Sequence, residues 1–323
     1  MKIETVLKIF SWRIIVKYFY SFGTLAIIIL IFDLIKPGLL EQQTIITILR
    51  SAAPIVIMAC AYTLVMISGE IDLSIGSILA FCGVGYGLLA QAGVPVWIAL
   101  FLASGIGGIL GLFNGMVVTK LKIPSVIATL TTMSVLRGIS SILCGNDKYI
   151  KTGLPKDFSL FGRGEFLNLP IQFFIFLVVI IIFAVIMYKS LIGKYAIAVG
   201  ANKTAAKLAG IKTNKIIIIC FVLMGLASGL AGVLEASRFQ IADPRAGLGR
   251  ELTVITAVLL GGTSFKGGEG SLLSNVAGAF IISVLAIGMN RIDISPFYQQ
   301  IFQGIILILA IIIDKVVKEK IIV

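Results

Sequence analysis

The sequence predicts an all-α, polytopic membrane protein with about ten transmembrane helices, and three observations support that prediction. Of the 323 residues, 59% are apolar and 13% are charged, whereas soluble globular chains are about 45–50% apolar and about 25% charged. The mean hydropathy is +1.09. The apolar residues form long runs instead of short stripes. These properties exclude an ordinary soluble enzyme, a secreted disulfide-rich scaffold and a disordered regulator.

A helix that crosses the hydrocarbon core needs about 20 mostly apolar residues, and runs of this kind occur along the whole chain. We place them at 18–35, 46–67, 75–91, 95–118, 124–144, 170–188, 216–234, 246–262, 271–290 and 299–314. Only an Ala-Gly-Val-Pro turn at 92–95 separates the third run from the fourth. No small-residue cleavage site follows the first run, so we interpret it as a retained span and not as a signal peptide.

The charges between these runs predict their orientation. With the N-terminus inside, the inner segments carry sixteen Lys and Arg against six Asp and Glu, and the outer segments carry ten against nine. We therefore expect both termini to face the cytoplasm. No loop exceeds about 30 residues, whereas an independent domain needs about 50 or more. The sequence thus predicts a single integral membrane domain over 1–323, without an ATPase or catalytic domain of its own.

Several chemistries are excluded by what the sequence lacks. There is no histidine, which removes histidine-dependent nucleophilic catalysis and every zinc site that uses this ligand. The four cysteines have no C-x-x-C spacing and lie in or beside apolar runs, at Cys60, Cys82, Cys144 and Cys220. We interpret them as buried apolar side chains and expect no metal site. The net charge of +12 indicates membrane topology and not nucleic-acid binding, because the lysines cluster between apolar runs.

Two connections between spans mix glycine, hydroxyl and charged residues. They are Ser-Gly-Glu-Ile-Asp-Leu-Ser-Ile-Gly-Ser at 68–77 and Gly-Gly-Thr-Ser-Phe-Lys-Gly-Gly-Glu-Gly-Ser at 261–271. Asp72 or Ser74 can cap the next helix, and the stretch can also be an irregular break at membrane depth. The second connection is not a phosphate loop, because Lys266 is followed by Gly267. Their similar places in the two halves suggest an internal duplication and point to a transport pathway.

Polar side chains inside the predicted spans are further pathway candidates, because such groups usually face protein or water. They are Asn114, Thr129, Thr131, Arg137 and Glu251. Other interpretations stay open, since Arg137 can snorkel to the outer interface and each threonine can bond back to its own helix. Ionisable groups within spans are scarce, which fits a neutral solute.

The longest inner loop, 189–215, holds six lysines and no acidic residue. Asn202 can cap a short helix that contains Ala205, Ala206 and Leu208, and Gly210 can end it. Such a helix can lie on anionic lipid or dock into a partner protein. Charge alone leaves both uses open.

In order along the chain, these motifs resemble the permease subunit of carbohydrate ABC importers of the ribose type. The resemblance covers roughly 45–314 and is carried by 69–77, Asn114-Gly115, Lys-Ile-Pro-Ser-Val-Ile-Ala-Thr-Leu at 122–130, Arg137-Gly138, 198–211 and 261–271. Autoinducer-2 permeases share most of these motifs, and branched-chain amino-acid permeases are more distant. The sequence departs from the pattern at Glu70 and Thr131, where the family commonly has glycine, and this leaves the exact solute open.

The resemblance implies a location, partners and a mechanism. It implies a homodimer or heterodimer of permeases in the cytoplasmic membrane of a bacterium, with an extracytoplasmic sugar-binding protein. A separate ATPase subunit, often tandem, would carry ATP and magnesium, and this chain would hold no cofactor. The family's coupling loop falls on Asn202, Ala205, Ala206, Leu208 and Gly210, which favours docking to the ATPase over the lipid alternative. The expected activity is ATP-driven import of a monosaccharide such as ribose by alternating access.

Two other classes of protein compete with this interpretation. An ion-coupled secondary transporter or channel would use buried carboxylates in its spans, and Glu251 is the candidate. A membrane-embedded enzyme needs a nucleophile with a base, or a metal cluster, and the sequence offers neither. Transport without ATP hydrolysis would favour the first class, and turnover by the isolated chain would favour the second.

Overall fold

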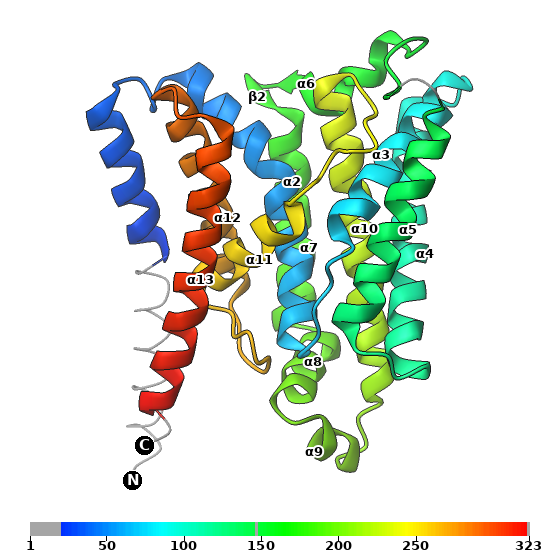
Figure 1. Ribbon diagram of the computed structural model, residues 1–323, viewed down its shortest axis with the longest axis vertical. Helices are drawn as coiled ribbons and strands as arrows, with labels where there is room; N and C mark the ends of the chain where they lie inside the picture. The colour runs from blue at the N-terminus through cyan, green and yellow to red at the C-terminus, as the bar shows by residue number, and fades with distance from the viewer. Residues whose placement is uncertain (1–20, 146–147, 322–323) are drawn as a thin grey trace.

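The helices form one bundle in a computed structural model that describes residues 21–145 and 148–321, without the side chains of 313–321. Most helices run roughly along the long axis of the molecule (Figure 1). The main helices of the bundle are Ser21–Ile35, α2 Gln42–Ile67, α3 Ile75–Gln91, α4 Val96–Lys120, α5 Ser125–Leu143, α7 Ile171–Tyr188, α10 Thr213–Phe239, α11 Arg250–Leu260, α12 Leu272–Arg291 and α13 Pro296–Ile321. The connections contain η1 Lys156–Ser159, α6 Leu160–Arg163, the hairpin of β1 Glu165–Phe166 with β2 Leu169–Pro170, α8 Leu191–Ala201 and α9 Lys203–Leu208.

Six of the described helices are long and apolar enough to cross a membrane by themselves, namely α2, α4, α5, α7, α10 and α12. Each predicted run overlaps a helix, although residues 18–20 of the first run lie outside the described residues. The eighth run is the exception in length. Its helix α11 has 11 residues and measures about 17 Å at 1.5 Å per residue, whereas the hydrocarbon core is about 30 Å thick. The polytopic, mainly helical class is confirmed, and the count of ten crossings and the position of the termini stay predictions.

Two irregular segments enter the bundle from opposite ends. Residues 68–74 rise from the lower end of α2, and residues 240–249 descend from the upper end of α10, so α3 and α11 both begin near mid-height (Figure 1). The predicted span at 246–262 is wrong in its first residues, because Gly247 and Gly249 have φ angles of +68° and +74° and the helix begins only at Arg250. The segment before α11 packs closely against the first turn of α3, since a Cβ on Gly76 would lie 2.3 Å from the Gly247 carbonyl oxygen. Glycine is needed here because any side chain would separate the two segments.

The central helix α10 packs against α4, α3 and α2. Its backbone touches that of α4 directly, since a Cβ on Gly107 would lie 2.3 Å from the Gly225 carbonyl oxygen, and a Cβ on Gly225 would lie 2.1 Å from that of Gly107. A Cβ on Gly111 would likewise lie 2.1 Å from the Phe221 carbonyl oxygen. Lipid tails are as apolar as leucine and give no hydrophobic drive between helices, so this close van der Waals packing is what holds the pair together.

The connection between α5 and α7 covers the upper ends of α3 and α10. Phe158 stacks on Tyr86 of α3 with 4.6 Å between the ring centroids, and its carbonyl oxygen accepts a 2.7 Å hydrogen bond from the Ser237 hydroxyl of α10. Ile150 pairs with Ala242 through two backbone hydrogen bonds of 2.9 Å. The connection therefore fixes the top of the descending segment 240–249.

We expect the α4–α10 contact to reject a side chain at Gly107. Gly107→Val would push atoms into the backbone of α10, and overpacking of this kind costs about 1–3 kcal/mol or more. Gly105 lies on the same helix, and a Cβ there would have no atom within 4 Å, so Gly105→Val is the matched control. Thermal unfolding of the two variants in detergent makes the comparison. Equal losses of stability would contradict the backbone contact.

Candidate functional site

The break between α2 and α3 is organised around two fully buried polar side chains. Asp72 Oδ1 accepts hydrogen bonds from the backbone N–H of Ser74 at 2.8 Å and from its hydroxyl at 2.6 Å. Ser74 stands at the N-cap position of α3 but makes no side-chain bond to that helix. Asp72 therefore orders the residue before the helix, and the Ser74 hydroxyl is used within the bundle and not as the predicted cap.

A chain of hydrogen bonds continues from Ser74 across two further helices. The Asn114 amide of α4 donates to the Ser74 hydroxyl at 2.8 Å, and its oxygen accepts a 2.6 Å bond from the Thr132 hydroxyl of α5. All of these side chains are buried. The break, α4 and α5 are thus joined by one continuous polar network.

Side chains of neighbouring helices also bind the backbone of the break. The N–H of Ile71 donates to the Ser125 hydroxyl at 3.2 Å, and that of Leu73 donates to the Thr129 hydroxyl at 3.0 Å. The N–H of Asp72 donates to the Tyr62 hydroxyl of α2 at 3.2 Å. Irregular backbone inside a membrane persists only when the protein or water satisfies it. The structure therefore supplies what a break at this depth requires.

Thr131 does not join this network. It is exposed, and its hydroxyl donates to the Ile127 carbonyl oxygen of its own helix at 2.9 Å. It lies two residues beyond Thr129, which turns it to a different side of α5. The sequence left open whether the threonine hydroxyls bond to their own helix, and Thr131 does so.

Arg137 holds the second irregular segment from α5. Its Nη1 donates to the carbonyl oxygens of Pro244 at 2.8 Å and Ala246 at 2.6 Å. These carbonyls belong to non-helical backbone that lacks helical partners. Arg137 is therefore a bridge between α5 and the descending segment, and the snorkelling alternative does not describe it.

Glu251 lies in the first turn of α11, against the start of α3. A Cβ on Gly76 would lie 2.7 Å from its Oε2, and Glu251 also acts electrostatically on Arg137. Its Oε2 is buried, and so is Oδ2 of Asp72; neither has a hydrogen-bond partner among the described residues. The pathway candidates other than Thr131 thus lie in or against one of the two irregular segments, or in the helix turn that follows it.

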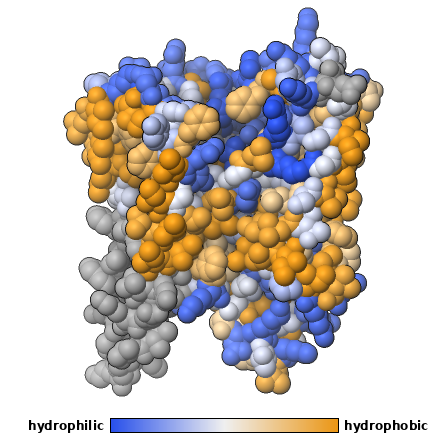
Figure 2. Space-filling model, viewed as in Figure 1, coloured by the Kyte–Doolittle hydropathy of each residue, from blue (hydrophilic) through white to orange (hydrophobic). Residues whose placement is uncertain are grey.

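A cavity of about 270 Å³ adjoins the descending segment and holds residues that the sequence analysis missed. Its wall includes Glu235, Phe239, Asp243 and Arg245. Glu235 pairs with Arg250 at 2.9 Å, and Asp243 with Arg245 at 3.2 Å. Figure 2 shows hydrophilic side chains reaching from the upper end into the apolar belt on the face it displays. The run Ala-Asp-Pro-Arg-Ala-Gly-Leu-Gly at 242–249 was the available signal, since proline and glycine beside charges indicate a loop.

The short helix α9 lies at the opposite end of the molecule. The predicted cap is present, because Asn202 Oδ1 accepts the Ala205 N–H at 2.9 Å. Gly210 follows the helix with a φ of +83°. Ala206 is buried, Ala205 is exposed, and the Leu208 side chain is 85% exposed. The helix therefore presents an apolar tip to whatever lies beyond it.

Two contacts connect this end to the break. Lys203 of α9 forms a 3.2 Å ion pair with Glu70, one of the two residues at which the sequence departs from the family pattern. Gly200 at the end of α8 packs against Ile67 so closely that a Cβ would lie 1.8 Å from the Ile67 carbonyl oxygen. That oxygen also accepts the Gly268 N–H at 2.8 Å. The two glycine-rich connections found in the sequence also touch each other near the end of α8, since a Cβ on Gly267 would lie 2.9 Å from the Gly69 Cα.

The described residues contain no cluster of His, Cys, Asp or Glu that could hold a metal ion. All four cysteines are buried and free. The chemistry available near the break is hydrogen bonding by hydroxyl, amide and carboxylate groups, which suits the binding or passage of a polar molecule.

Comparison with known proteins gives a consistent picture. Residues 44–311 match the family model described as the permease component of the branched-chain amino acid transport system. The chain is 35% identical over 291 residues to the ribose import permease protein RbsC of Bacillus subtilis (strain 168), which covers 90% of each chain. It is 36% identical over 303 residues to RbsC of Haemophilus influenzae, covering 93% of this chain and 94% of that one. It is also 36% identical over 258 residues to the L-arabinose transport system permease protein AraH of Escherichia coli (strain K12), covering 80% and 78%. No solved structure matches.

We expect Thr129 and Thr131 to differ sharply in their effect on stability. Thr129→Val removes the acceptor of the Leu73 N–H, and an unsatisfied buried donor costs about 1–3 kcal/mol. Thr131→Val removes only a bond to its own helix and should change stability by less than about 0.5 kcal/mol. Chemical denaturation in detergent, together with proteolysis near 68–74, compares these isosteric variants. Matching denaturation midpoints would overturn the assigned role of Thr129.

Proposed function

This chain belongs to the family of branched-chain amino acid transport system permease components, and from that premise we propose that it is the membrane-spanning subunit of an ABC importer for a monosaccharide. The observation that carries the proposal is the similarity to ribose import permeases over 90% or more of the chain. The L-arabinose permease adds a second pentose among the relatives. Ribose or a similar pentose or hexose is the solute that these relatives favour.

The chain acts as a transport subunit and not as an enzyme. In our proposal the energy comes from a separate ATPase chain, single or tandem, which holds ATP and magnesium while this chain holds no cofactor. A second permease chain, identical or related, completes the path through the cytoplasmic membrane. An extracytoplasmic binding protein delivers the sugar. The support is the family membership together with the absence of a nucleotide-binding loop from the sequence.

The contacts of α9 suggest how ATP hydrolysis would reach the path. Leu208 is the exposed apolar side chain that a groove of the ATPase would bury. Displacement of α9 would act on Glu70 through Lys203, and the adjoining α8 would press on residue 67 through the close packing of Gly200. Residues 68–74 contain Asp72 and its hydrogen-bond network. A displacement of their lower end would therefore reach the start of α3.

The residues near the irregular segments suit a neutral, hydroxyl-rich solute. The cavity beside 240–249 carries charged and aromatic groups, and its Glu235 already has a cationic partner in Arg250. A sugar needs hydrogen bonds and no counter-charge. Weak contacts are sufficient in this chain, because the binding protein would select the solute.

The proposed function is tested by purification followed by assays in vesicles. The chain should co-purify with an ATPase subunit, and hydrolysis by the complex should rise several-fold with the binding protein loaded with ribose or a related pentose. Screening sugars on the binding protein identifies the solute, and autoinducer-2 belongs in the same screen. Solute uptake by the chain alone, in vesicles without ATP, would refute the proposal and point to ion coupling through Glu251.

The coupling role of α9 is tested separately by Leu208→Asp. A carboxylate at this apolar tip should abolish co-purification with the ATPase while membrane insertion stays intact. Leu167, in the turn of the β1–β2 hairpin at the opposite end, is 75% exposed, so Leu167→Asp is the control and should keep the complex. If Leu208→Asp binds the ATPase as the control does, α9 is not the docking helix.

A further inference from the structure

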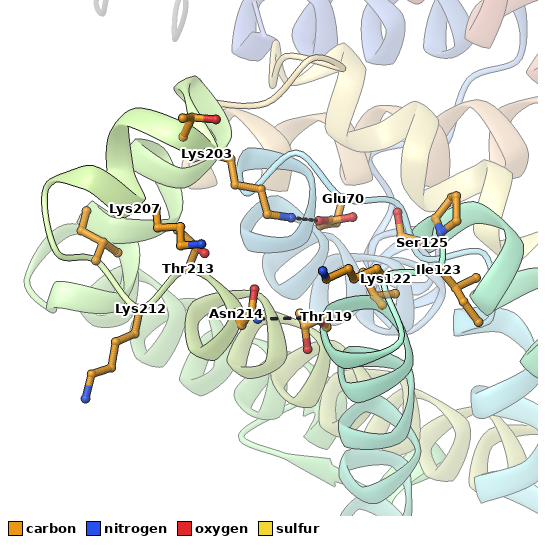
Figure 3. Close-up of a pocket in the computed structure, with 14 residues that line it drawn as sticks. Glu70, Thr119, Lys122, Ile123, Ser125, Lys203, Lys207, Lys212, Thr213 and Asn214 are labelled. Carbon is orange, nitrogen blue, oxygen red and sulfur yellow. Dashed lines mark hydrogen bonds and ion pairs between the residues drawn. The ribbon is translucent and has the colours of Figure 1, made fainter.

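A cavity of about 950 Å³ opens between α9, the turn from α4 to α5, and the start of α10 (Figure 3). Its wall carries four lysines, Lys122, Lys203, Lys207 and Lys212, and one carboxylate, Glu70. Lys203 is paired with Glu70 at 3.2 Å. Among the side chains that the structure describes, none of the other three lysines has a carboxylate within ion-pair distance. The cavity therefore keeps an uncompensated positive charge.

Two of these lysines face the space of the cavity. Lys122 and Lys207 point inward from different walls, whereas Lys212 points away (Figure 3). Lys122 has a φ of +58°, a left-handed conformation that costs a non-glycine residue energy. Its presence at a position suited to glycine is explained if the ammonium group serves a purpose there.

Two long helices add to the positive potential. The cavity wall includes Ser125 and Thr213, the first residues of α5 and α10. Neither helix has a side chain that caps its N-terminus, and a helix N-terminus carries a partial positive charge. The potential therefore favours an anion between the lysines.

The position of the cavity relative to the membrane indicates which anion it binds. α4 ends, and α5 and α10 begin, at its wall, and all three helices are candidate membrane spans. The ends of spans lie in the headgroup layer of a bilayer. Leu121 and Ile127 are close in sequence to the cavity residues Lys122 and Ser125 and are 67% and 56% exposed, so an acyl chain at this depth would meet apolar side chains.

We propose that this cavity binds the phosphate of an anionic phospholipid, with Lys122 and Lys207 as its ligands. Basic pockets between spans are suited to such headgroups. A zwitterionic lipid is disfavoured because it would bring its own cation beside the lysines. The site is independent of the transported solute, and an acidic segment of the ATPase is the competing occupant that the experiment must separate.

The test uses the full chain in nanodiscs and measures bound phosphatidylglycerol by native mass spectrometry against phosphatidylcholine. Lys122→Gly with Lys207→Gln removes both ammonium groups, and glycine at 122 relieves the positive φ, so the fold should survive. Removing the charges of two lysines near a membrane surface should lower the affinity for phosphatidylglycerol roughly tenfold or more. Lys189→Gln with Lys194→Gln removes the same charge from exposed positions of the inner loop 189–215, outside the cavity wall, and should have little effect.

Several results would overturn the proposal. They are an absence of preference for phosphatidylglycerol in the unmodified chain, equal losses in the two double variants, or stabilisation by millimolar inorganic phosphate in detergent with no response to the lipid. Full displacement of bound phosphatidylglycerol when the ATPase chain is added would assign the cavity to the protein partner. Retained binding in Lys122→Arg with Lys207→Arg, together with loss in the neutral variant, would support the phosphate site.

Discussion

Backbone amides that leave a helix inside a membrane must find acceptors within the protein, and the course of residues 68–74 depends on that requirement. Hydroxyl groups of α2 and α5 provide the acceptors, and Asp72 turns the chain into α3. Because these acceptors sit on separate helices, α2, α3 and α5 are fixed relative to one another. Asn114 then extends the arrangement to α4. The bundle is organised around a segment that has no regular structure.

Contacts without intervening side chains give this architecture its stiffness. Gly107 against Gly225, Gly76 against Gly247 and Gly200 against residue 67 all bring two backbones together. Close-packed interiors transmit displacement because they compress little. In the proposed coupling, a push on α9 would move the lower end of the break, and the ion pair of Lys203 with Glu70 would keep the two parts together.

Hydropathy was sufficient to locate the long helices of the bundle, because a membrane span has to be apolar over its whole length. It failed at 246–249, where Ala246 and Leu248 look apolar although the glycines beside them take positive φ angles. Asn202 was predictable as a cap from its place before an alanine-rich stretch. The threonines of α5 could not be separated by residue type, since only the direction of each on the helix distinguishes Thr129 from Thr131.

Part of the missed network does leave a trace in the sequence. Ser125, Thr129 and Thr132 follow at the i, i+4 and i+7 spacing of one helix face, and together they bind the break and Asn114. Tyr62 gives no such signal, because no pattern of polar residues on its face of α2 marks it as a partner of the break. To predict the residues of the cavity beside 240–249, one has to recognise a short loop between apolar runs. Hydropathy averaged over a window hides a loop of that length.

The early start of α3 and α11 has an electrostatic consequence. Each helix directs its N-terminus, with about half a positive charge, into the interior of the bundle, and each has an acid beside it, Asp72 before α3 and Glu251 in the first turn of α11. These carboxylates therefore balance helix dipoles inside a medium that penalises isolated charge. Charge in this region is thus placed in opposed pairs, and an uncharged molecule would pass without altering them. In the proposed importer, the ends of two shortened helices would therefore supply the positive potential that lets acids stay buried beside the path of a neutral solute.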